Sequence, residues 1–171
     1  GNFLYVTGAG DSVYVVDIRP GSKFYHQTIK TLQMEEDAQQ DFHPSKRRGT
    51  PGITVSADGD YLYVGAERWV PSSGKVNSFQ GSVGGAINIF NVERETAPVW
   101  DDDAPDPQQA WEQQVEEWGH QVYQAKPPLI PTAITASDDP DRLTVAYYRQ
   151  VMSHTAEEGG GYAPGLFSFD T

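Results

Sequence analysis

The chain lacks cysteine, long apolar runs and an excess of basic residues, and each absence excludes a class of function. Zero cysteine in 171 residues excludes disulfide bonds and thiol catalysis. No apolar run approaches the about 18 residues of a membrane-spanning helix, so no membrane span is expected. Lys and Arg number 12 against 24 Asp and Glu, a formal net charge of −12. This charge repels phosphates, so no nucleic-acid partner is expected.

Grouped metal ligands and catalytic motifs are also missing. Neither histidine nor cysteine occurs at the spacing of a metal site. The acidic run Asp101–Asp106 lacks the alternating pattern of a calcium loop, and no helix is expected after Gly159–Gly161 to bind phosphate. We therefore expect no metal and no cofactor. The catalytic residues stay unknown, and the prediction leans away from an enzyme.

The most informative pattern present is a repeated phrase. Residues 53–64 align without a gap on residues 134–145, and each copy alternates as strand, tight turn and strand. The turn in the first copy is Ala57–Asp60, whose glycine suits a tight hairpin. Phe3–Val6 matches the end of the phrase as a third, shortened copy. Repeats of this size predict a solenoid or a propeller.

A second phrase follows each copy and supplies a third strand. It reads Val13–Asp17, Ile87–Asn91 and Leu166–Asp170, and each ends in Asp or Asn, which suits a turn. After the first of these strands, Arg19–Ser22 reads as a turn and Phe24–Lys30 as a fourth strand. The unit is therefore four antiparallel strands, which is the composition of a propeller blade.

These units predict an all-β fold, a β-propeller segment of about two and a half four-stranded blades in a single partial domain, 1–171. We expect a partial blade at 1–33, a full blade at 51–126 and a partial blade at 131–171. A closed propeller needs about 4–8 blades, so the chain is expected to be a segment of a longer protein.

Three stretches resemble a known family. Phe3–Gly8, Asp11–Asp17 and Ser56–Val64 are similar to the YVTN-type β-propeller repeat and to lactonase-like seven-bladed propellers. The resemblance implies a binding or interaction scaffold, at the cell surface, outside the cell or in the periplasm. Two alternatives stay open: a lactonase-like hydrolase with an active site at the channel mouth, and a structural module of a surface or toxin-like assembly. The implied partner is the remainder of its own propeller, or another chain that completes it.

Long connections fall on one face of the predicted propeller. They are Gln33–Thr50, Ala66–Gly85 and Tyr147–Gly165, whereas the connections to the other face are short except after the second unit. Long loops on a rigid scaffold usually carry binding, so a protein or small-molecule ligand is expected on this face. The alternative is that these are tolerated insertions without a function.

The candidate binding residues lie in these connections and at the upper end of the second strand of each unit. Arg68 and Arg149 occupy the same position in successive units, where two guanidinium groups suit a carboxylate or phosphate, or else ordinary ion pairs with nearby acids. The full set of candidate residues is Glu67, Arg68, Trp69, Phe79, Tyr148, Arg149 and His154.

An inserted helix is expected at 107–119, with Asp106 as N-cap and Pro107 as its first residue. Its apolar face comprises Trp111, Val115, Trp118 and Val122. This face is expected to pack on the chain's own sheets, and the alternative is a partner-binding helix. The fourth strand of the second unit is expected at either Gln121–Lys126 or Thr96–Trp100.

Overall fold

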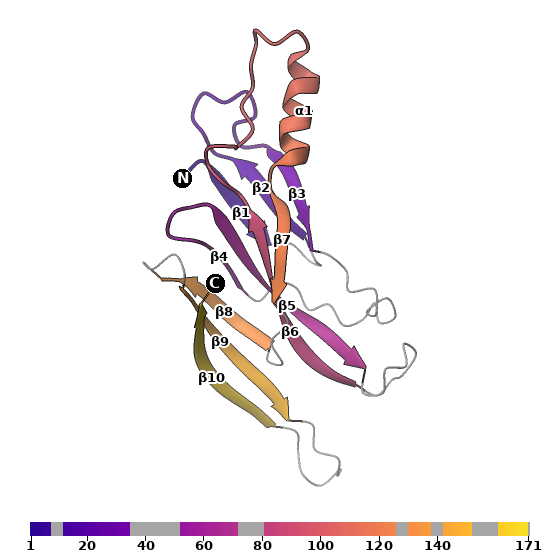
Figure 1. Cartoon of the computed structure of the whole chain (residues 1–171), viewed down its shortest axis with the longest axis vertical. Coiled ribbons are helices and arrows are strands. Elements are labelled where there is room, and N and C mark those ends of the chain that lie inside the picture. Colours follow the sequence, from indigo (N-terminus) through magenta and orange to yellow (C-terminus); the bar gives the residue numbers. More distant parts are fainter. Residues whose placement is uncertain are drawn as a thin grey trace.

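The described part of the chain is mostly antiparallel β-sheet with one short α-helix (Figure 1). The computed structural model describes residues 1–7, 12–34, 52–71, 81–125, 130–137, 142–151 and 161–170. Within these residues, ten strands form three sheets, of three, four and three strands. The predicted all-β class with antiparallel sheets is therefore confirmed. The division into propeller blades stays a prediction.

Sheet one contains β1 (Phe3–Thr7), β2 (Ser12–Asp17) and β3 (Thr28–Gln33), in that order. Because successive side chains of a strand point to opposite faces, β2 buries every second residue. Val13 and Val15 are fully buried, whereas Tyr14 between them is 41% exposed. Sheet one is therefore covered on one face only, as far as the described residues go.

The fourth strand of the first unit begins later than predicted. The prediction covered Phe24–Lys30, but β3 starts at Thr28 because the residues before it form turns. The backbone N of His26 donates to Asp17 O at 2.7 Å, and Asp17 N donates to Gln27 O at 3.0 Å. These bonds to the end of β2, together with a positive φ of 62° at His26, hold the segment in its turn.

Sheet two is the four-stranded sheet. Its strands are, in order, β4 (Gly52–Val55), β5 (Tyr61–Pro71), β6 (Gly81–Asn91) and β7 (His120–Ala125). β7 corresponds to the first of the two segments predicted for the fourth strand. The predicted hairpin turn is also confirmed, since Ser56 N donates to Tyr61 O at 2.8 Å and Gly59 has a φ of 90°.

Sheet three contains β8 (Ile130–Ala136), β9 (Arg142–Val151) and β10 (Gly161–Asp170) in the order β10-β9-β8. The turn of the second copy of the repeated phrase is expected at Asp138–Asp141, between β8 and β9, and it lies outside the described residues. Both neighbouring pairs of strands run antiparallel, as they do in the other two sheets.

Two connections that were predicted as long loops are strand over much of their length. The ladder of β5 and β6 continues to the pair Pro71 and Gly81, inside the predicted loop Ala66–Gly85. The ladder of β9 and β10 likewise continues to the pair Val151 and Gly161, inside the predicted loop Tyr147–Gly165. These stretches contain Gly and Pro, which are depleted in strands. Pairing between two neighbouring strands outweighs this preference.

The inserted helix is α1 (Pro107–Glu117), which ends slightly before the predicted Gly119. Its N-cap is Asp106, as predicted, and the carboxylate accepts a hydrogen bond from Gln109 N at 3.0 Å. Val122 lies on β7 and is 45% exposed, so its placement on the apolar face of the helix was wrong. The helix stops at Glu117, and the strand pairing of β7 takes over from His120 onward.

Sheet two lies between the other two sheets, and each of its faces forms a core with one of them (Figure 1). Leu62 and Val64 are fully buried against sheet one. Tyr63 and Ile87 point the other way and belong to a second core with sheet three. The residues of sheet three in that core are Ile134, Leu143 and Val145.

Two paired glycines allow sheet three to approach sheet two closely. Gly52 of β4 and Gly65 of β5 are register partners. A Cβ at Gly52 would lie 2.9 Å from the backbone N of Ile134, whereas a Cβ at Gly65 would lie 2.9 Å from the Cδ1 of the same residue. The close contact therefore involves rigid backbone at the first position, and at the second position the Ile134 side-chain tip together with the Pro131 ring, whose Cγ would lie 3.1 Å away.

Gly52→Ala is expected to lower the free energy of unfolding by about 1–3 kcal/mol, because the added methyl group forces the β8 backbone away from β4. The matched control Gly65→Ala should cost less than Gly52→Ala, because it meets the Ile134 tip, which can rotate, and the Pro131 ring but no backbone atom, and because alanine restricts the unfolded chain. Urea unfolding followed by circular dichroism measures both. Equal costs at the two positions would contradict this account of the contact.

Candidate functional site

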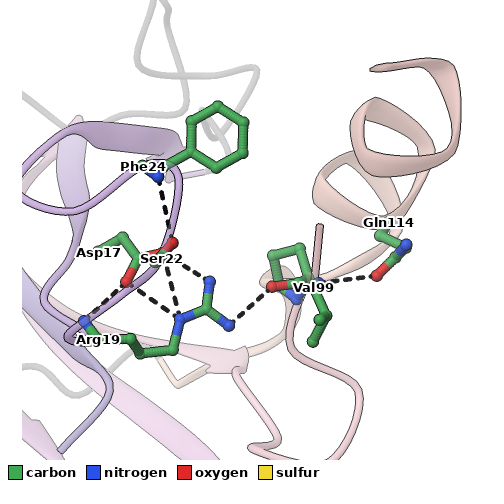
Figure 2. Close-up of polar contacts among 7 residues, drawn as sticks. Asp17, Arg19, Ser22, Phe24, Val99 and Gln114 are labelled. Atoms are coloured by element: carbon green, nitrogen blue, oxygen red, sulfur yellow. Dashed lines mark hydrogen bonds and ion pairs between the residues drawn. The ribbon is translucent and has the colours of Figure 1, made fainter. Parts of the chain in front are cut away.

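A buried carboxylate organises the turn that follows β2. Asp17 is fully buried, and its carboxylate accepts hydrogen bonds from Arg19 N at 2.9 Å and from Ser22 Oγ at 2.7 Å (Figure 2). The Arg19 guanidinium adds an ion pair, with Nη2 at 2.6 Å and Nε at 3.0 Å. We call Asp17, Arg19 and Ser22 the Asp17 network. It confirms the expectation that the acidic residue at this strand end supports a turn.

The Asp17 network continues across the sheet boundary to α1. Arg19 Nη1 donates to Pro98 O at 2.9 Å, in the segment that leads from β6 to the helix. The backbone N of the next residue, Val99, donates to Gln114 Oε1 on α1 at 2.9 Å (Figure 2). Hydrogen bonds therefore connect the end of β2, the segment after β6 and the helix into one unit.

The hydrogen bonds also set the charge state of the network. Burial alone would raise the pKa of Asp17, but the hydrogen bonds from Arg19 and Ser22 and the guanidinium charge outweigh it. The pKa of Asp17 is therefore lowered below its ordinary value. An ionised, fully paired carboxylate of this kind stabilises the turn and is not available for proton transfer.

Aromatic side chains hold α1 against sheet one. Phe24 stacks on Trp111 of the helix with ring centroids 4.0 Å apart, and it meets Trp100 edge-on at 5.6 Å. At the far end of the helix, Trp118 is 3% exposed and packs on Phe3 at 5.0 Å. The tryptophans of the predicted helical stripe thus pack on the chain's own sheet.

Lys30 of β3 fixes the carboxyl end of α1. Its Nζ donates to Val115 O at 2.6 Å, to Glu116 O at 3.0 Å and to Trp118 O. The last carbonyls of a helix carry partial negative charge, so a cation at this end is stabilising. Burial lowers the pKa of Lys30, and the nearby Glu116 carboxylate acts in the opposite direction.

A surface cleft of about 550 Å³ opens beside the Asp17 network. We call it the Trp100 cleft: residues 19–23 form one wall, and Val99, Trp100 and Asp102 form the other. Lys23 Nζ lies 3.3 Å from the centroid of the Trp100 ring, and Trp100 Nε1 donates to Asp102 Oδ1 at 2.8 Å. The cleft therefore offers an aromatic wall, the Lys23 ammonium and the Asp102 carboxylate, together with Arg19, which is paired with Asp17, and Val99 at 59% exposure.

Two further ionisable groups have pKa values that are shifted away from neutrality. Burial raises the pKa of Tyr5 to about 12, so this phenol stays protonated at neutral pH. The Ser56 hydroxyl and the Asp60 amide lower the pKa of Asp58, which therefore stays ionised. A general acid or base works best with a pKa near the operating pH, and these shifts lead away from neutrality.

Of the seven residues of the predicted site, the structure describes the backbone of five. The backbones of Glu67, Arg68 and Trp69 lie in β5, and those of Tyr148 and Arg149 lie in β9. They thus occupy corresponding ends of β5 and β9. Phe79 and His154 lie outside the described residues. The role of all seven as a binding site stays a prediction.

The Trp100 cleft was missed at the sequence level. Arg19–Ser22 was recognised as a turn, and the acidic run after Trp100 was recognised as a loop. The two segments are far apart in the chain, and nothing in either indicates that Lys23 reaches the Trp100 ring. The sequence shows only that both turns carry charged or aromatic residues. Local sequence patterns do not predict that two turns so far apart in the chain lie side by side.

The described residues contain neither a cluster of metal ligands nor a helix that could span a membrane. Across the described ranges, no group of three or more His, Cys, Asp or Glu side chains lies close enough to hold a metal ion. α1, with 11 residues, is too short and too polar to cross a membrane. No other helix in the described part of the chain is long and apolar enough to do so.

Comparison with known proteins gives no assignment. No family model matches the chain, and neither a curated protein nor a solved structure matches it. The function therefore has to be argued from the described geometry.

Asp17→Asn is expected to lower the free energy of unfolding by about 2–3 kcal/mol at pH 7, because the amide keeps the shape but loses the charge-assisted bonds to Arg19. Because folding lowers this pKa, the stabilisation is present above the ordinary value of 3.8 and is lost as the pH falls through the folded-state pKa. The difference from wild type should therefore shrink below about pH 3.8.

Urea unfolding at a series of pH values measures this difference. The exposed control Asp103→Asn should stay within about 0.5 kcal/mol of wild type. A deficit for Asp17→Asn that does not vary with pH would contradict the ion-pair interpretation.

Two helix tryptophans differ in their indole N–H groups and provide a matched test. Within the described residues, Trp111 Nε1 is buried without a hydrogen-bond partner, whereas Trp118 Nε1 donates to Glu93 O at 2.9 Å. Trp111→Phe should change stability by less than about 1 kcal/mol, because removing a costly unpaired donor offsets the lost ring area. Trp118→Phe should cost about 2–4 kcal/mol. Thermal unfolding decides, and a larger loss at Trp111 would contradict the assignment.

Proposed function

We propose that this chain is part of a propeller-like β scaffold that binds further sheets and protein partners. The single observation that supports the proposal is a packing pattern that repeats from sheet to sheet and is uncovered at one end. This pattern is carried by the Leu-x-Val pair on the second strand of each repeated unit, which lies on β1, β5 and β9.

Two of the three Leu-x-Val pairs are buried by a preceding sheet. Leu62 and Val64 of β5 are each 0% exposed and pack against sheet one. The aligned Leu143 and Val145 of β9 are 0% and 1% exposed and belong to the core with sheet two. Sheets two and three therefore each use the same face to contact the sheet before them in the chain.

The third pair lies on the outer face of sheet one and has no such cover among the described residues. Leu4 and Val6 of β1 are 50% and 41% exposed, and Tyr14 beside them on β2 is 41% exposed. We call these three residues the outer face of sheet one. Exposed apolar patches of this kind mark interaction sites, and the repeat indicates that another antiparallel sheet is the fitting partner.

The repeat resembles that of YVTN-type and lactonase-like propellers, and propellers close with about 4–8 blades. Three sheets do not reach that number, so the fitting sheet comes from the remainder of the propeller or from another chain that completes it. The proposed location is extracellular, at the cell surface or in the periplasm. This location rests on the resemblance alone.

The alternative of a lactonase-like hydrolase requires an acid or base poised in a cleft. The described groups with shifted pKa are either fully paired, as Asp17 and Lys30 are, or shifted away from neutrality, as Tyr5 and Asp58 are. The geometry of the described residues therefore favours the scaffold. No particular residue favours a structural module of a surface or toxin-like assembly.

The outer face of sheet one is tested by self-association of the 171-residue chain. We expect the wild type to associate with rising concentration in analytical ultracentrifugation. Leu4→Lys/Val6→Lys should weaken that association by about a hundredfold or more, because two apolar side chains lose their burial. The control Gln108→Lys/Gln113→Lys makes the same charge change on the exposed side of α1 and should associate as the wild type does.

Thermal unfolding of all three proteins checks that the substitutions leave the fold intact. A wild type that stays monomeric at every concentration, or a control that dissociates as strongly as the Leu4/Val6 variant, would count against the scaffold.

A further inference from the structure

The free edge of β1 differs from the corresponding edges in the other two sheets. Among the described strands, β1 pairs with β2 alone, whereas β5 lies between β4 and β6. β9 is likewise flanked by β8 and β10. The position beside β1 is therefore the one that β4 and β8 occupy in their own sheets.

Alternating backbone groups of β1 point toward this position. Ile18 N donates to Asn2 O at 3.1 Å, which identifies the register position where β1 and β2 exchange hydrogen bonds. In an antiparallel ladder such positions alternate, so the residues between them direct their N–H and C=O groups away from β2. These residues are Phe3, Tyr5 and Thr7.

Among the described residues, the edge of β1 carries none of the usual protection against pairing. Edge strands are commonly protected by charged side chains, proline, bulges or a covering element. The sequence Phe-Leu-Tyr-Val-Thr has no charge and no proline. The opposite edge of sheet one is different: β3 carries Lys30, which binds the end of α1, and a bulge lies between β2 and β3.

A cleft of about 360 Å³ lies next to the same strand. Phe3 and Tyr5 line it from β1, and on the other side it is lined by Val55 of β4, Asp58 of the turn after β4 and Val92, which follows β6. Beside the free edge there is thus room for the side chains that an added strand would direct toward sheet two.

We infer that the free edge of β1 binds an extended peptide segment, antiparallel to β1, in which β-branched apolar residues alternate with small polar ones. The inference rests on the proposed scaffold role but uses the backbone of β1, whereas the outer face of sheet one uses side chains. It identifies the partner by chemistry: an unstructured or flexible segment that adds a strand.

The preferred sequence follows from how β4 pairs with β5. Ile53 pairs with Val64 and Val55 with Leu62, and the residues of β1 that align with this pair are Val6 and Leu4. An added strand in the same register would place Ile and Val beside the exposed Val6 and Leu4. The Thr between them would pair with Tyr5 and face the cleft.

The probe is a fluorescent peptide with the sequence of residues 51–57, Pro-Gly-Ile-Thr-Val-Ser-Ala, titrated with the full chain and followed by fluorescence anisotropy. We expect saturable binding. N-methylation of the Thr amide, which faces β1 in this register, should weaken binding about tenfold or more. N-methylation of the Val amide, which points away from β1, should leave the affinity within about twofold.

Variants of the chain test the same edge. Thr7→Pro removes an N–H that points to the free edge without breaking the pairing of β1 with β2, and it should weaken binding about tenfold. The isosteric Thr7→Val keeps the N–H and should bind as the wild type does. Because the two peptides are compared on the unaltered chain, their result stands even if Thr7→Pro fails to fold.

Amide hydrogen exchange identifies where the peptide binds. Added peptide should slow amide exchange at Phe3, Tyr5 and Thr7. It should leave amide exchange in the strands of sheet three unchanged. Equal affinity of the two N-methylated peptides, no saturable binding, or protection of the three amides by a second copy of the chain in the absence of peptide would each overturn the inference. Working below the concentration of self-association keeps this result separate from the test of the outer face.

Discussion

Burial of alternate strand residues between neighbouring sheets is the constraint on which the rest of the structure depends. Sheet two has a core on both faces, with Leu62 and Val64 on one side and Tyr63 and Ile87 on the other. Each such side chain contributes about 1.5–3 kcal/mol when fully buried. Sheets one and three are three-stranded and have one covered face each among the described residues, so their stability depends on sheet two.

The polar and aromatic contacts around α1 add orientation to this packing. Arg19 connects the turn after β2 to Pro98, and Lys30 connects β3 to the end of the helix. Trp118, which follows the helix, is also buried against Phe3 of β1. The helix therefore connects sheet one, through these contacts, to sheet two, whose strand β7 follows it in the chain. A helix held at both ends does not have a free apolar face for a partner, and this favours the first of the two interpretations of the tryptophan stripe.

The sequence predicted those features that depend on local chemistry. Period-2 alternation located the strands, Gly59 located the hairpin and Asp106 located the start of α1.

The features that the sequence did not predict depend on contacts between distant segments. β3 begins late because Asp17 binds the backbone of the preceding turn, and β5 extends to Pro71 because β6 pairs with it. The Trp100 cleft joins two turns that no local pattern relates. For the predicted site, the sequence placed Arg68 and Arg149 at equivalent positions, and the strands confirm this for the backbone alone.

β1 combines two kinds of interaction that do not compete. Its side chains Leu4 and Val6 point to the outer face of sheet one, whereas the free N–H and C=O groups of Tyr5 lie in the plane of the sheet. A sheet stacked on the face and a strand added at the edge therefore approach from perpendicular directions. A strand bound at the edge would also place its own Ile and Val beside Leu4 and Val6, which enlarges the apolar face. Binding at the edge should thus strengthen stacking on the face, because the same apolar surface becomes wider and more rigid.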